Sequence, residues 1–153
     1  MTRVVLALLC ACLVLASCGG DEDEGSDEFL QQANAICANY GPKIAAISPP
    51  FEDIDEWGAV GADIGDQLEA SVNELRLLNP SDELAEQYSE WVALRADLLT
   101  EMRGVQDAGN IHDEAGVEAG LASITELQTQ ADELAEKLGL TDCSPTGITV
   151  ESP

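Results

Sequence analysis

Residues 72–91 read VNELRLLNPSDELAEQYSEW and are the most informative stretch about the architecture of this chain. At their centre, Asn79-Pro80-Ser81 predicts a tight turn, because proline removes a backbone donor and pushes the preceding residue out of helical geometry. Apolar residues on both sides of the turn recur every three to four positions, which is the period of one buried helix face. The stretch therefore predicts two amphipathic helices joined by a short loop.

The same period continues outward along the chain. We expect a first helix that begins near Ser26, a second over about residues 52–78, a third carrying the apolar stripe from 84 to 105, and a fourth over about 113–138. Tyr88 and Trp91 fall on the third stripe and are expected in the core, and Gly139 is expected to end the fourth helix. Short turns make consecutive helices antiparallel, so we predict an all-α fold, an up-down-up-down four-helix bundle over residues 29–143.

The N-terminus has the pattern of an export signal. Arg3 precedes an apolar run over residues 4–16, which is too short to span a bilayer but typical of a signal-peptide core. The following Leu15-Ala16-Ser17-Cys18 resembles a bacterial lipobox, which implies removal of residues 1–17 and a diacylglycerol thioether on Cys18. Two acyl chains hold a protein stably on a membrane. We therefore expect a lipid-anchored protein on the extracytoplasmic face of the cell membrane.

The composition is strongly acidic, with 30 Asp and Glu against 6 Lys and Arg and a formal net charge of −24. Such a charge repels phosphates, so nucleic acid is a poor partner, whereas cations or a basic partner are favoured. Residues 18–28 contain the lipidated cysteine and a run of like charges, which we interpret as a flexible acidic tether. Residues 144–153, rich in Ser, Thr, Pro and Gly, are expected to form a loose C-terminal tail.

Two cysteines remain in the expected domain, Cys37 and Cys143. In an exported protein an even pair predicts a disulfide. The chain must then fold back after the fourth helix to reach the middle of the first. A metal site is the alternative, but two thiols with no nearby histidine are too few ligands for zinc.

Three segments carry a family resemblance: FLQQANAIC at 29–37, LRLLNP at 75–80 and LGLTDC at 138–143. They resemble uncharacterised small exported helical lipoproteins of high-GC actinobacteria, which have a similar ANAIC near the start and LGL…C near the end. The resemblance implies a helical fold and a pair of bonded cysteines, and it implies no activity.

The sequence contains no recognisable catalytic set. Its single histidine, His112, follows a predicted turn and is expected to be exposed to solvent, and no Glu-x-x-His pairs of the di-iron bundles occur. We therefore expect no enzyme, no metal centre and no cofactor other than the lipid on Cys18.

Glycines and aromatic residues are expected to gather at the end of the bundle far from the anchor. Because glycine inside a helix is destabilising, either this end is less stable or its helices approach closely through Gly61/Gly65 and Gly116/Gly120. A ligand-binding surface around Phe51, Trp57 and His112 is one hypothesis; closure of the apolar end of the bundle by the aromatic residues is the other.

Two function classes follow from these observations. The first is a non-enzymatic interaction or structural protein of the cell envelope that contacts a protein or wall polymer. The second is a small-ligand or cation-binding lipoprotein.

Overall fold

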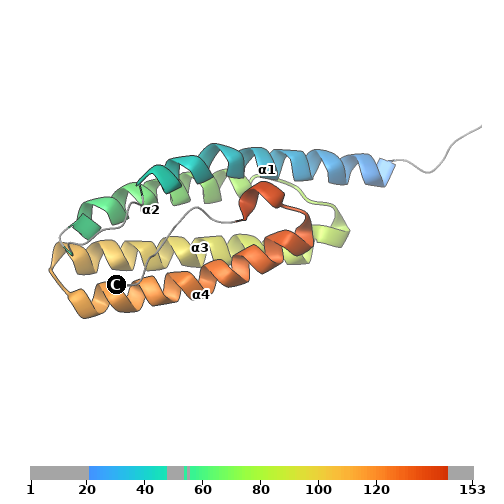
Figure 1. Cartoon of the computed structure of the whole chain (residues 1–153). Helices are drawn as coiled ribbons and strands as arrows, with labels where there is room; N and C mark the ends of the chain where they lie inside the picture. The colour runs from blue at the N-terminus through green and yellow to red at the C-terminus, as the bar shows by residue number, and fades with distance from the viewer. Residues whose placement is uncertain (1–20, 48–53, 55, 145–153) are drawn as a thin grey trace, which may run out of the picture.

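The computed structural model describes residues 21–47, 54 and 56–144 of the chain. Four helices run α1 (Asp21–Ile47), α2 (Glu56–Leu75), α3 (Asp82–Asn110) and α4 (Glu114–Leu138), and a 3-10 turn, η1 (Thr141–Cys143), follows. Each helix runs antiparallel to the one before it (Figure 1). The described residues form no strand, so the predicted all-α four-helix bundle is confirmed.

The largest departure from the expected helix boundaries is at the start of α1. This helix begins at Asp21 rather than near Ser26, so residues 21–28, which we interpreted as a tether, are helical. The lipobox cysteine, Cys18, and the rest of residues 1–20 lie outside the described residues.

Helix α2 is shorter than predicted. It ends at Leu75, and hydrogen bonds from Leu77 N to Glu74 O (3.1 Å) and from Leu78 N to Leu75 O (3.1 Å) tighten the chain into a turn. Apolar periodicity continues through Leu78, but the proline at position 80 prevents its neighbour from staying helical. Residues 76–78 lie outside the helix, in the loop between α2 and α3.

The predicted stripes form the core. Trp91 and Leu98 of α3, Leu68 and Leu75 of α2, and Ile124 of α4 are fully buried. Burying one such large apolar side chain contributes about 1.5–3 kcal/mol. The Phe29 ring of α1 meets Tyr88 edge to face at 4.8 Å between centroids, which brings α1 onto the same core.

Helices α2 and α3 come close together where glycine removes a side chain. A Cβ on Gly61 would lie 3.0 Å from the Cα of Gln106, and a Cβ on Gly109 would lie 2.6 Å from the backbone nitrogen of Gly58. A Cβ on Gly120 would likewise lie 2.5 Å from Val105 Cγ2, between α4 and α3. The predicted close approach through glycines is confirmed.

The C-terminal segment fills the space between α1 and α4. Helix α1 packs mainly on α2 and η1, and η1 also contacts α4 (Figure 1). Cys37 and Cys143 form a disulfide with their Cα atoms 4.9 Å apart, as predicted. Asn34 of α1 adds two hydrogen bonds: its Oδ1 accepts from Asp142 N at 2.9 Å and its Nδ2 donates to Gly139 O at 3.4 Å.

The reversal that brings η1 back to α1 is a Schellman motif. Gly139 adopts a left-handed conformation with φ 78°, its N–H donates to Glu136 O, and Leu140 N–H donates to Ala135 O. Leu140 is then fully buried. The predicted role of Gly139 as the terminator of α4 is confirmed.

Candidate functional site

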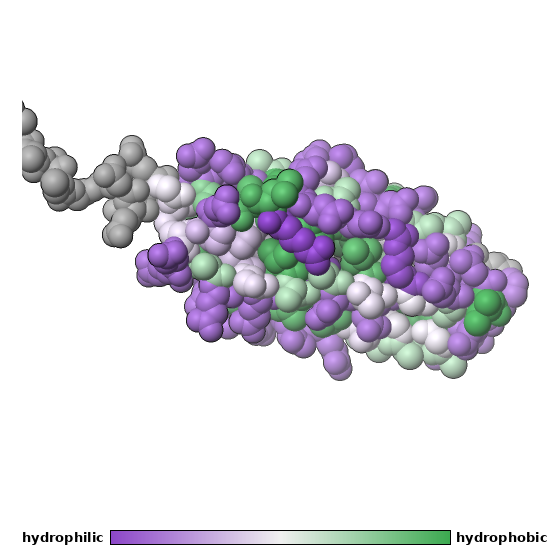
Figure 2. Space-filling view, turned by 180° about the vertical axis from the view of Figure 1, so that it is seen from behind, coloured by the Kyte–Doolittle hydropathy of each residue, from purple (hydrophilic) through white to green (hydrophobic). Residues whose placement is uncertain are grey.

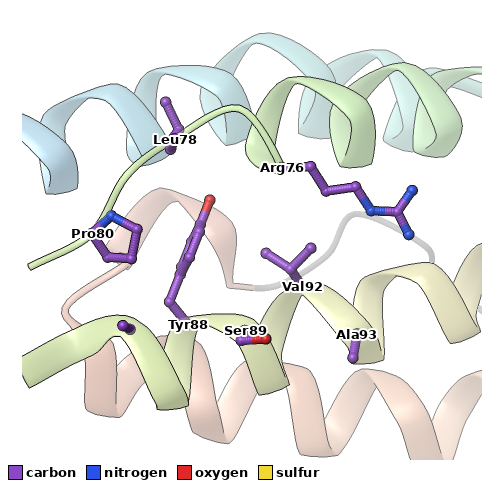
Figure 3. A pocket seen from close by; sticks show the side chains of 8 residues that line it. Arg76, Leu78, Pro80, Tyr88, Ser89, Val92 and Ala93 are labelled. Carbon is purple, nitrogen blue, oxygen red and sulfur yellow. The ribbon is translucent and has the colours of Figure 1, made fainter. Parts of the chain in front are cut away.

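The loop between α2 and α3 opens a groove against α3. The groove has a volume of about 400 Å³ and is lined by Arg76, Leu78, Pro80, Ala85, Tyr88, Ser89, Val92 and Ala93 (Figure 3). Because α2 stops at Leu75, the chain crosses to α3 as a loop, and the side chains of Leu78 and Pro80 form one wall of the groove. Helix α3 forms the other wall.

Tyr88 holds the two walls together. Its hydroxyl donates a 2.8 Å hydrogen bond to the carbonyl oxygen of Leu75 at the end of α2, which also accepts from Leu78 N. The ring stands between α3 and the loop (Figure 3). Burial raises the pKa of this hydroxyl, so it remains protonated and keeps donating across the physiological pH range.

The groove continues into exposed apolar surface. Leu77, next to Leu78 in the loop, has 78% of its surface exposed. Apolar side chains appear between hydrophilic ones on the face turned away from the viewer in Figure 1 (Figure 2). Leu77 lies between the groove residues Arg76 and Leu78 in the chain, so it adds exposed apolar surface to the same loop.

Charges are distributed unevenly around the groove. Arg76 lies on the loop side and makes no ion pair with any described residue. On α3, the exposed carboxylates Glu86, Glu90 and Asp97 lie three or four residues from the groove residues Ser89 and Ala93, and thus on the same helix face. One wall is therefore cationic and the other acidic.

A second group of polar residues is buried in the core. Arg95 of α3 has only 3% of its surface exposed, and its guanidinium carbon lies 5.7 Å from the centre of the Trp91 ring. Burial lowers the pKa of Arg95 to about 10, and Asp132 of α4 acts in the opposite direction through its charge. Arg95 therefore stays charged at neutral pH.

Several polar atoms of this group lack hydrogen-bond partners. Within the described part of the chain, Trp91 Nε1, Arg95 Nε, Arg95 Nη1 and Asp132 Oδ1 are buried without a hydrogen bond. Burial also raises the pKa of Asp132, an effect that the charge of Arg95 opposes. The sequence contained one signal for this group, because Arg95 falls between Trp91 and Leu98 on the apolar stripe.

Trp57 and His112, two of the three proposed ligand-binding residues, lie at the opposite end of the bundle. The backbone of Trp57 borders Gly109, and His112 is exposed in the turn between α3 and α4. Phe51, the third, lies outside the described residues. The structure thus brings Trp57 and His112 to one end, as predicted, and the residue bounding that turn, Ile111, is 73% exposed.

His112 has a clear backbone role. It adopts a left-handed φ of 58° at the end of α3, where its N–H donates to Gly109 O and the N–H of Asp113 donates to Ala108 O. This is the same hydrogen-bond pattern that Gly139 provides at the end of α4. Asp113 then caps α4 by accepting from Gly116 N at 3.1 Å.

The described residues contain no group of three or more His, Cys, Asp or Glu side chains placed to hold a metal ion. None of the helices described here combines the length and the apolar character needed to cross a membrane. No family model, curated protein or solved structure matches this chain.

Proposed function

We propose that this chain is a non-catalytic interaction module of the cell envelope, held on the extracytoplasmic face of the membrane by a lipid on Cys18. One observation carries the binding part of the proposal: the half-apolar groove between the α2–α3 loop and α3, extended by the exposed side chain of Leu77. The lipobox-like Leu15-Ala16-Ser17-Cys18 supports the anchor. The partner is an envelope protein or wall polymer.

The position of the groove relative to the anchor supports this proposal. The α2–α3 loop lies at the end of the bundle where α1 begins (Figure 1). Only two residues, Gly19 and Gly20, separate Cys18 from the first residue of α1, Asp21. The groove would therefore open close to the membrane surface and meet partners that are themselves at the membrane.

The groove volume favours a second candidate, a small-ligand-binding lipoprotein. At about 400 Å³, the groove falls within the roughly 300–1,000 Å³ typical of small-molecule sites. A ligand that fills the groove alone would leave Leu77 uncovered, whereas a macromolecular partner would cover both. The exposed leucine is the reason to prefer the macromolecular partner.

Site-specific photo-crosslinking in membranes tests the proposal. A photoreactive residue replaces Leu77 in the full-length chain, and the control places it at Ile111, which is similarly exposed at the other end. We expect one reproducible adduct from position 77 that is absent from position 111. The adduct should disappear when Ala93, in the groove, is changed to Arg. Equal labelling from both positions, or none from position 77, would show that the groove is not the interaction surface.

A further inference from the structure

We propose that the groove takes an amphipathic segment of a partner protein, with apolar anchor residues flanked by lysine or arginine. This inference rests on the proposed function and specifies the chemistry of its partner. The argument uses the apolar walls of the groove, the charges beside them and the net charge of the chain.

The walls of the groove suit apolar anchors. Pro80 on the loop lies beside the ring of Tyr88 on α3 (Figure 3), and Leu78 and Val92 also line the groove. The groove is open to solvent, and Leu77 adds an exposed apolar side chain to the loop that lines it. Grooves of this form accept the apolar face of an amphipathic helix, which presents side chains at positions i, i+3 and i+4.

The α3 wall determines where the basic residues of the partner lie. Glu86, Glu90 and Asp97 are exposed beside the groove and make no ion pair within the described part of the chain. Each can receive a lysine or arginine from a bound segment. Arg76 on the loop wall repels such residues, so the basic side of the partner should lie along α3 and its neutral side along the loop.

The whole chain favours a basic partner over an anionic one. With a net charge of −24, it attracts cations and repels anions over several ångströms, and the effect weakens as salt is added. One arginine, Arg76, does not reverse a field of this size. A fatty acid or another anionic amphiphile would match the apolar walls but not the charges around them.

The test uses the full-length lipidated chain in phosphatidylcholine nanodiscs, whose lipids carry no net charge. The probe is a fluorescein-labelled 16-residue helical peptide with leucines along one face and lysines on both flanks, and binding is measured by fluorescence anisotropy. We expect saturable binding at a 1:1 ratio. A peptide with glutamates in place of the lysines, and one with serines in place of the leucines, should each bind at least about tenfold more weakly.

Two pairs of variants separate the groove from the general charge. Ala93→Arg places bulk and positive charge in the groove, whereas Ala122→Arg makes the same change on the exposed face of α4. Ala93→Arg should raise the Kd at least about tenfold, and Ala122→Arg less than about threefold. Likewise Glu86→Gln/Glu90→Gln should weaken binding more than Glu118→Gln/Glu126→Gln, although both remove two charges. Circular dichroism checks that each variant folds, and Ser89→Arg replaces Ala93→Arg if that variant does not.

Three results would overturn the inference. They are equal effects of the two pairs of Glu→Gln changes, equal binding of the glutamate peptide, and absence of saturable binding. If crosslinking from position 77 still gives its adduct, the proposed function stands and only the chemistry assigned to the partner is wrong. If crosslinking fails while the peptide binds through the groove, the proposed function at the membrane is wrong, and the partner chemistry assigned to the groove stands.

Discussion

Replacing Arg95 by methionine should stabilise the protein. Burial lowers the pKa of this guanidinium well below its usual value, to about 10, and Arg95 is only 3% exposed. Since each pKa unit corresponds to about 1.4 kcal/mol, keeping Arg95 charged in the folded protein costs about 3 kcal/mol at neutral pH. Methionine replaces the aliphatic part of arginine, carries no charge and removes the unpaired donors Arg95 Nε and Nη1.

Two losses reduce this gain. The cation–π contact between Arg95 and Trp91, 5.7 Å from the ring centre, disappears. Such a contact contributes about 0.5–2 kcal/mol. Asp132 also loses the positive charge that favours its ionised form. We therefore expect a net increase of about 1–2 kcal/mol in the free energy of unfolding, which is the cost of keeping Arg95 charged less these two losses.

Urea unfolding of the disulfide-bonded protein at pH 7, followed by tryptophan fluorescence, measures this change. The control is Arg103→Met, because Arg103 is more exposed and pairs with Asp66 at 2.7 Å and Glu69 at 3.0 Å. That variant should lose no more than about 1 kcal/mol. A loss of more than about 1 kcal/mol in Arg95→Met would refute the reasoning, since it would mean that the buried guanidinium stabilises the fold.

Four further predictions test the framework of the bundle. Cys143→Ser opens a loop spanning 106 residues and should lower the free energy of unfolding by about 4–5 kcal/mol in the chain-entropy model, measured by urea unfolding. Gly139→Ala should lower it by about 1–2 kcal/mol, because φ 78° is strained for any side chain although Leu30 leaves room for the Cβ. Gly61→Ala should lower the melting temperature, because its Cβ would lie 3.0 Å from Gln106 Cα. Gly104→Ala is the control: its Cβ would meet no atom within 4 Å, so this variant should raise the free energy of unfolding by about 0.5–1 kcal/mol. Folding raises the pKa of Asp132 above 3.8, so the protonated carboxyl contributes its full stability below pH 3.8, and this contribution is lost as pH rises through the folded pKa. The stability of Asp132→Asn relative to wild type should therefore increase with pH over that window. A difference that does not change with pH would contradict the raised pKa.

The bundle could be predicted from the sequence because the signals for its helices and turns lie in short stretches of the chain. Apolar residues at a helical period identify four helices, Pro80 identifies a turn, and Gly139 identifies a helix end. Short loops then leave the antiparallel arrangement as the simplest packing. The disulfide followed because Cys37 and Cys143 were the two cysteines left in the expected domain.

The groove could not be predicted because it depends on where α2 ends. Apolar spacing continues through Leu78, and periodicity alone assigns Arg76, Leu77 and Leu78 to the helix. The turn required by Pro80 releases these residues earlier, and they become the wall and rim of the groove. The extent to which a proline unwinds the helix before it depends on tertiary contacts, such as the hydrogen bond from Tyr88 to Leu75.

Arg95 and η1 were missed for a related reason. An arginine among apolar residues reads as a break in the stripe, and its burial depends on what packs over it. The space between α1 and α4 is filled by a segment only three residues long, Thr141–Cys143, which has no periodicity of its own. Its position follows from the disulfide and from Asn34, which are contacts between residues more than 100 positions apart.

The lipid on Cys18 is the premise that places the groove at the membrane, and the intact mass of the protein extracted from membranes tests it most directly. The account predicts a chain that begins at Cys18 and carries a diacylglyceryl group, with two fewer hydrogens than after reduction because of the Cys37–Cys143 bond. An unmodified Cys18, or a chain that retains residues 1–17, would contradict the anchor and remove the reason to search for the partner at the membrane surface.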